Sequence, residues 1–381
     1  MQHAQGKWLV SGLAVLLAVG LWLTWAAARR PPAAPAAAEH IPAKESRANQ
    51  TPTDRQLDGL PEALQRTQAL LQTAQDVEEK RRQLAALRQI LSSPKTNEVS
   101  EGIRSFLQSK ADAATGQAFR IRDRGTLSEA PTLRVFLLDY LGQIDPAAAA
   151  AYARTILTRF DSADEWAVAL RNLAAGDSGA DARDLLQRKV SDLFAYDPWQ
   201  KNPSVGYLEA FDVAVYLGGT KLLPQLSELI RKQDNPAIAH AAFLALDRLV
   251  IKDPSSLLVA LLTEPDLMKG RELTRADYFA RADVRDPQQR QVLEGYLADS
   301  RIGGAERDQF AGVFPNANFM ISQNLLTTTA TPDHSALSAR DAESLRVVQE
   351  WLNNPGFTAL RPQLEKMKSR LEVFVRQADG K

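Results

Sequence analysis

Two stretches of the chain, 132–160 and 235–262, repeat one plan in which an apolar helical segment is followed by Asp-Pro and a second apolar segment. The Asp-Pro pairs lie at 145–146 and 253–254. Such a pair suits the start of a helix, because the carboxylate can accept hydrogen bonds from free backbone N–H groups and proline already has a helical φ. Each predicted helix has one apolar stripe that it cannot bury alone, and stacking on its neighbours would bury it. The pattern predicts an all-α fold of stacked helices.

The same plan continues between the two stretches. Residues 211–230 predict a helix, a turn at 218–219 where two glycines follow each other, and a further apolar helix. Within the first stretch, Gly142 predicts a break in the first helix. The segments therefore have the character of internal repeats of unequal length.

The segment 235–262 resembles a HEAT-type repeat of the armadillo class. Asn-Pro at 235–236 opens its first helix, and Asp-Pro lies where such repeats begin their second helix. The residues on the packing face of the first helix are Ala241, Ala242, Leu246 and Leu249. The resemblance covers about 130–265, and His240 stands where many such repeats have arginine. It implies an irregular α-α superhelix, or solenoid, that binds other proteins and usually catalyses nothing.

A strongly apolar run without any charged residue lies near the start of the chain, from Trp8 to Trp25. As a helix rising about 1.5 Å per residue it would be roughly 27 Å long, close to the thickness of a bilayer's hydrocarbon core. Tryptophan at both ends is typical of membrane interfaces. We predict a short tail over 1–7 and a transmembrane signal-anchor over 8–28. A signal peptide cleaved at the alanines 26–28 is the alternative.

Residues 29–56 are rich in proline and alanine and predict a disordered linker that holds a domain away from the membrane. Lys7 precedes the apolar run and two arginines at 29–30 follow it, so the count of positive charges leaves the orientation almost undecided. The spacer favours a cytoplasmic (inner) membrane protein of bacterial type with its bulk in the periplasm or outside.

After the linker the chain predicts a long helix that Asp58 caps and that has Pro61 in its first turn. Its apolar stripe consists of Leu64, Leu71, Ala74, Val77, Leu84, Leu87 and Leu91. The stripe is interpreted as the face of one long helix packed on the next, and a coiled-coil arm is the alternative. Residues 119–127 alternate around Asp-Arg-Gly and predict a small hairpin.

Composition excludes several kinds of chemistry. Cysteine is absent, which excludes disulfides, thiol nucleophiles and thiolate metal sites. The four histidines never lie three or four residues apart, so we expect no metal site and no cofactor. His240 is interpreted as a structural histidine. The 46 basic and 46 acidic side chains balance, which disfavours a nucleic-acid partner.

Two irregular stretches are candidates for partner binding. Residues 194–211 predict a long loop with large aromatic side chains, which either plug the space between repeats or anchor a partner. Residues 312–335 interrupt the helical pattern and are predicted to close the stack or reach back across it. The candidate partner-binding residues are Tyr196, Trp199, Tyr207, Phe314, Asn316, Asn318 and Phe319.

The last predicted helices are separated by Asn-Asn-Pro-Gly at 353–356. The second has an apolar face made of Leu360, Leu364, Met367, Leu371 and Phe374. Its charged opposite face suits the end cap of a repeat stack. An amphipathic helix that docks on a partner or a membrane is the alternative.

The sequence thus predicts a membrane anchor, a linker, an N-terminal helical region over 57–128, HEAT-like repeats over 129–265, and C-terminal helices with a cap over 266–381. The expected function is that of a non-catalytic scaffold or adaptor that binds another protein outside the cytoplasmic membrane. The alternatives are an enzyme that processes an envelope peptide or glycan with dispersed carboxylates, and a subunit that braces a membrane assembly.

Overall fold

The computed structural model describes residues 59–92, 95–232, 234–318, 322–329 and 333–378. The predicted tail, transmembrane segment and linker, 1–56, lie outside the described residues, as does the predicted cap Asp58. None of the helices that the structure describes is both long and apolar enough to cross a bilayer.

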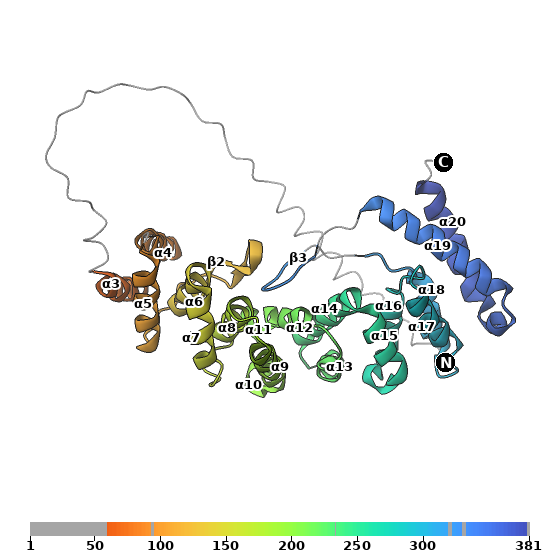
Figure 1. The fold of residues 1–381 in the computed structure, drawn as a ribbon, viewed down its shortest axis with the longest axis horizontal. Coiled ribbons are helices and arrows are strands. Elements are labelled where there is room, and N and C mark those ends of the chain that lie inside the picture. Colours follow the sequence, from red (N-terminus) through yellow and green to blue (C-terminus); the bar gives the residue numbers. More distant parts are fainter. Residues whose placement is uncertain (1–58, 93–94, 233, 319–321, 330–332, 379–381) are drawn as a thin grey trace, which may run out of the picture. The chain divides into compact units, whose positions relative to one another are not determined.

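The all-α prediction is confirmed for the described part of the chain (Figure 1). The α-helices are α3 Leu60–Thr73, α4 Val77–Leu91, α5 Thr96–Gln108, α6 Leu133–Ile144, α7 Pro146–Ile156, α8 Ala163–Gly176, α9 Ala180–Ala195, α10 Asp197–Lys201, α11 Val205–Glu209, α12 Asp212–Leu217, α13 Leu223–Arg231, α14 Pro236–Lys252, α15 Pro254–Thr263, α16 Glu272–Phe279, α17 Pro287–Ala298, α18 Gly304–Val313, α19 His334–Asn353 and α20 Arg361–Ala378. The 3₁₀ turns are η1 Asp123–Gly125, η2 Pro265–Met268 and η3 Pro355–Leu360.

The described strands form two separate antiparallel hairpins. The first pairs β1 Arg120–Ile121 with β2 Leu127–Glu129, which confirms the hairpin predicted over 119–127. The second pairs β3 Ser322–Gln323 with β4 Thr328–Thr329. We call it the strap, meaning residues 322–329, because it crosses to a distant part of the chain.

Most helices pack on elements close to them in the sequence. Helix α7 packs on α8, α13 on α14, α16 on α18, and α19 on α20. One apolar core runs through these contacts, and its largest fully buried side chains include Trp166 and Trp351. Neighbouring helices therefore bury one another's apolar stripes, as the sequence pattern requires.

The interpretation of 58–91 as one long helix or a coiled-coil arm is wrong. The helix ends at Thr73, and Asp76 begins α4 by accepting a hydrogen bond from the N–H of Glu78. Helix α3 packs on α4, so the two halves of the apolar stripe face each other. Val77, at the break, is exposed.

Glycine at 142 does not end a helix, contrary to the prediction, since α6 continues to Ile144. A Cβ atom on Gly142 would lie 2.3 Å from Oδ1 of Asn172 in α8. The glycine is needed there for a close approach between helices. The turn predicted at 218–219 is confirmed, and both glycines have φ of 70°.

Both Asp-Pro pairs begin helices as predicted. The carboxylate of Asp145 accepts from the N–H of Ala148 at 3.0 Å, and that of Asp253 accepts from the N–H of Ser256 at 3.3 Å. Asp145 also accepts a hydrogen bond from the Ser100 hydroxyl at 2.7 Å, which ties α5 to the start of α7. These caps satisfy N–H groups that have no partner within the helix.

Replacing Asp145 by alanine is expected to lower the free energy of unfolding by about 1 kcal/mol at neutral pH. Hydrogen bonds from Ser100 and from the N–H of Ala148 hold the pKa of Asp145 below its ordinary value of 3.8. The stabilisation is therefore present above that value and lost as pH falls through the lowered folded-state pKa. Urea unfolding at several pH values should show the difference from wild type shrinking in acid. The control is Asp253→Ala, which removes only a helix cap. If the loss of stability in Asp145→Ala grew in acid, the role given to the Asp145 carboxylate would be contradicted.

Candidate functional site

The strap lies on residues far from it in the sequence. The backbone N–H groups of Leu326 and Thr327 donate to Oδ2 of Asp212 at 2.7 and 2.9 Å, across 114 and 115 residues of chain. The Thr327 hydroxyl donates to the other oxygen of the same carboxylate. Asp212 begins α12, is only 2% exposed, and forms an ion pair with Arg248 at 3.2 Å. The strap, which is part of the stretch 312–335, thus reaches back across the helices, and this was one of the two predicted arrangements.

The tip of the strap also meets the tip of the first hairpin, as Figure 1 shows near β2 and β3. Gly125 has φ of 70°, and a Cβ atom on it would lie 1.9 Å from the carbonyl oxygen of Leu325. Leu325 is buried beside it. Only glycine fits there, because both the positive φ and the nearby backbone exclude a side chain.

Two arginines hold the segment that leads into the strap. Arg340 of α19 donates to the carbonyl oxygens of Arg281 at 2.9 Å and Asn316 at 3.2 Å. The N–H of Asn316 donates to Ala280 O at 2.7 Å. The Arg281 guanidinium forms two hydrogen bonds of 2.9 Å with the Asp247 carboxylate. Arg281 also donates to Asn316 O at 3.2 Å. The segment that leads into the strap is therefore fixed on α19 and on the residues that directly follow α16.

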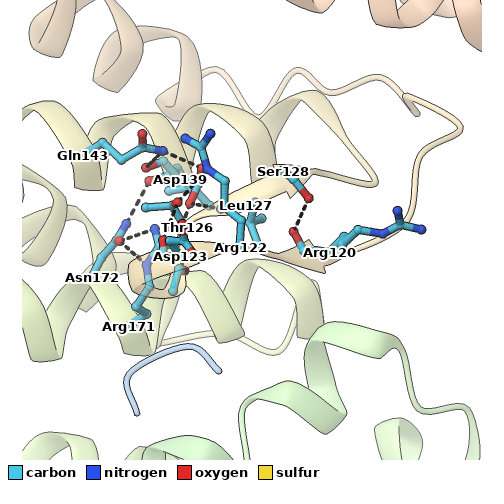
Figure 2. Close-up of polar contacts among 12 residues, drawn as sticks. Arg120, Arg122, Asp123, Thr126, Leu127, Ser128, Asp139, Gln143, Arg171 and Asn172 are labelled. Atoms are coloured by element: carbon cyan, nitrogen blue, oxygen red, sulfur yellow. Dashed lines mark hydrogen bonds and ion pairs between the residues drawn. The ribbon is translucent and has the colours of Figure 1, made fainter. Parts of the chain in front are cut away.

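A buried polar network of Arg171, Asn172, Asp139 and Gln143 holds the tip of the first hairpin (Figure 2). Arg171 of α8 forms an ion pair of 2.5 Å with Asp139 of α6 and donates to Gly125 O at 2.7 Å. Asp139 also accepts from the N–H of Leu127 at 3.1 Å and from the Gln143 amide at 2.7 Å. The hairpin tip that meets the strap is thus fixed to two helices by one guanidinium.

A cavity of about 780 Å³ lies between the two hairpins, and we call it the arginine cavity. Its lining is Arg122–Thr126, Gly142, Gln143, Arg171, Asn172, Ala175 and Asn324–Thr328. Among the described residues, Arg122 and Arg124 form no ion pair, and both are exposed. The cavity is open, polar and rich in hydrogen-bond donors.

A smaller cavity of about 290 Å³, the glutamate cavity, lies on α14 beside β3 and β4. Its lining is Leu208, Glu209, His240, Ala241, Leu244, Asp247, Arg248, Ile251, Ser322–Asn324 and Thr329. Burial raises the pKa of Glu209, while Arg248 lowers it and Asp212 raises it further. Burial also raises the pKa of Asp247, against the opposing charge of Arg281. Asn324 lines both cavities, so the strap separates them.

The stretch predicted as a long loop contains two short helices: Trp199 lies in α10, Tyr207 lies in α11, and Tyr196 is the cap residue between α9 and α10. Tyr196 stacks on Phe160 with ring centroids 4.2 Å apart, and Trp199 meets the edge of Tyr196 at 4.9 Å. Tyr207 is fully buried, burial raises its pKa, and its hydroxyl has no hydrogen-bond partner in the part of the chain that is described. This packing favours the plug alternative over the anchor.

Trp199→Ala is expected to lower the free energy of unfolding by about 2 kcal/mol, because the half-buried indole contacts Phe160, Trp166, Tyr196 and Tyr207. Urea unfolding followed by circular dichroism measures the loss, and recovery of a partner should stay unchanged at temperatures where the variant is folded. Normal folding with loss of a partner would instead identify an anchor.

The partner-binding candidates of the stretch 312–335 that the structure describes precede the strap in the chain, and they do not form one site. Phe314 is fully buried and packs near Phe310 and Trp351. Asn316 is half-buried, and Asn318 is exposed. Phe319 lies outside the described residues.

His240 is exposed and lines the glutamate cavity, and no group of three or more potential metal ligands lies among the residues with described placement. Sequence reasoning missed Gly125, Asp212 and Glu209. Gly125 had a signal, since Asp-Arg-Gly marks a turn. Asp212 and Glu209 had none, because their importance depends on contacts with the strap.

Comparison with protein-family models, with curated protein sequences and with solved structures finds no match for this chain.

Proposed function

We propose that this chain is a non-catalytic, HEAT-like helical-repeat adaptor, held at a membrane by residues 8–28, that binds another protein on the face crossed by the strap. The observation that carries this proposal is the strap itself, which is hydrogen-bonded to Asp212 and pressed on Gly125. It leaves a cavity on each side, with backbone and side-chain groups available to a polypeptide. Extended peptides are commonly held through such mixed contacts.

The lining of the arginine cavity supports binding more than catalysis. It offers guanidinium, amide and hydroxyl groups, and its one carboxylate is the exposed Asp123. General acid–base catalysis needs a group that can give or take a proton near neutral pH, and guanidinium groups stay protonated. Guanidinium groups instead recognise carboxylates and backbone carbonyls.

The second candidate is an enzyme that acts on an envelope peptide or glycan. It is favoured by the glutamate cavity, where Glu209 and Asp247 line one space and burial raises both pKa values. Hydrolysis by two carboxylates needs both groups free to exchange protons or attack. Asp247 is instead held by the two hydrogen bonds from Arg281, so the adaptor is the better supported function.

A photo-crosslinking amino acid placed in the full-length chain at Gln143 or Thr328, in its native membrane, tests the adaptor. Both side chains are exposed and line the arginine cavity. The control position is Glu365, an exposed residue of α20 that lines none of the cavities described. We expect one protein adduct of discrete mass from both cavity positions and none from the control.

Absence of an adduct, or the same adducts from all three positions, would contradict a binding surface at the strap. Purified full-length chain that cleaves envelope peptides or glycans, with activity lost in Glu209→Gln, would establish the enzyme instead.

A further inference from the structure

The glutamate cavity combines apolar walls with one carboxylate whose charge is not paired. Leu208, Ala241, Leu244 and Ile251 supply the aliphatic part of its lining. Glu209 is half-buried at the end of α11 and makes no hydrogen bond or ion pair with any described residue. A half-buried carboxylate without a partner is costly, since it has lost water without gaining a donor.

The other charged groups of this cavity already have partners. Asp247 is bound by Arg281, with two hydrogen bonds of 2.9 Å. Arg248 pairs with Asp212 at 3.2 Å and donates to Leu244 O at 3.2 Å. Counted as unit charges, the two pairs cancel and Glu209 leaves the cavity lining with one net negative charge. Arg248 also attracts the Glu209 carboxylate, but it forms no ion pair with it.

We propose that the glutamate cavity receives the side chain of a lysine or arginine from the bound partner, with its cationic end on the Glu209 carboxylate. Both side chains carry a charge on an apolar stem, and the stem would lie along Leu244 and Ile251. This inference deepens the proposed function and rests on it for the identity of the ligand as part of a protein.

The charge of the site argues against an acidic ligand. A carboxylate or phosphate would be placed beside Glu209 and near Asp212, and like charges in a partly buried site repel. A purely apolar side chain would fill the space but leave Glu209 without a donor. A cation on an aliphatic stem satisfies both parts of the lining.

The test uses the full-length chain in a non-ionic detergent with three small probes, the N-acetyl methylamides of lysine, arginine and norleucine. Norleucine has a similar apolar stem and no charge. Ligand-observed NMR, corrected with protein-free micelles, measures binding, and we expect dissociation constants on the order of 1 mM for a cationic probe. At least one cationic probe should bind about tenfold more tightly than norleucine.

Two variants locate the binding. Glu209→Gln keeps the shape and removes the charge, and we expect it to weaken the cationic probe about tenfold. Glu365→Gln removes the same charge from the exposed α20 position and should leave binding unchanged. Ala241→Leu fills the cavity from one wall and should abolish binding of all three probes, with thermal unfolding showing that each variant is folded.

Equal binding of norleucine and the cationic probes, or unchanged binding in Glu209→Gln, would overturn the proposal. If only arginine binds, the site recognises a guanidinium, and if only lysine binds, it recognises an ammonium; both outcomes support a cation site. The result is independent of crosslinking at Gln143 and Thr328, so failure of the cation site and failure of the adaptor can be told apart.

Discussion

Arg171→Met is expected to lower the free energy of unfolding by about 3–5 kcal/mol, because it leaves the Asp139 carboxylate buried without its cation. The side chains of Arg171 and Asp139 are 6% and 3% exposed. Methionine fills much of the space but donates nothing to Asp139 or to Gly125 O. Urea unfolding of the full-length chain, followed by circular dichroism, measures the loss.

The matched control is Arg154→Met, which breaks an ion pair of 2.6 Å between side chains that are 40% and 37% exposed. Pairs in contact with water contribute about 1 kcal/mol or less, so this variant should be nearly as stable as wild type. The double variant Asp139→Leu with Arg171→Met should recover part of the loss, because both buried charges are gone. Equal effects of Arg171→Met and Arg154→Met would contradict the role of the buried network.

Asp212→Ala is expected to lower the free energy of unfolding by about 3 kcal/mol and to detach the strap from α12. The change removes the acceptor of two backbone N–H groups and the Thr327 hydroxyl, and it leaves Arg248 without its carboxylate. The amide hydrogens of Leu326 and Thr327 should then exchange with solvent much faster than in wild type. Hydrogen exchange resolved to the peptide covering 322–329 measures this local effect beside global unfolding.

Thr327→Val is the control for this second change. Of the three hydrogen bonds that Asp212 accepts from the strap it removes only the one from the hydroxyl, together with the 3.4 Å hydrogen bond that this hydroxyl accepts from the Asn324 amide. We expect this variant to lower the free energy of unfolding by about 1 kcal/mol and to leave the amide hydrogens of Leu326 and Thr327 protected from exchange. Protected amides in Asp212→Ala would mean that contacts at Leu325 and Gly125, and not the carboxylate, hold the strap.

The helices were predictable because their signals are local. Asp-Pro at 145–146 and 253–254 begins helices in the structure as in the sequence, since capping depends on residues two or three positions away. The break near Asp76 was missed because the apolar stripe continues through it at helical spacing. The sequence pattern reports which faces are apolar, and it does not report whether a helix bends back on itself there.

The candidate site was less predictable for a different reason. The irregular composition of 312–335 indicated a segment that reaches back, but nothing in it identified Asp212 as the acceptor. Glu209 stood within a stretch noted for its aromatic residues, and its lack of a partner becomes visible only when the cavity lining is known. Gly142 shows the same limit, because glycine is needed there only on account of the close approach of Asn172 in α8.

The strap has a consequence for synthesis of the protein. Ribosomes produce the chain from its N-terminus, so α12 leaves the exit tunnel more than 100 residues before Leu326 and Thr327. These two residues donate the backbone hydrogen bonds to Asp212, the first residue of α12. Until then Asp212 lacks these donors and both cavities lack one wall. Bringing the strap to Asp212 closes a long loop and lowers the entropy of the chain, and this step can occur only late in synthesis. A nascent chain that stops before the strap can form its helices, but it cannot yet form the two cavities that we assign to partner binding.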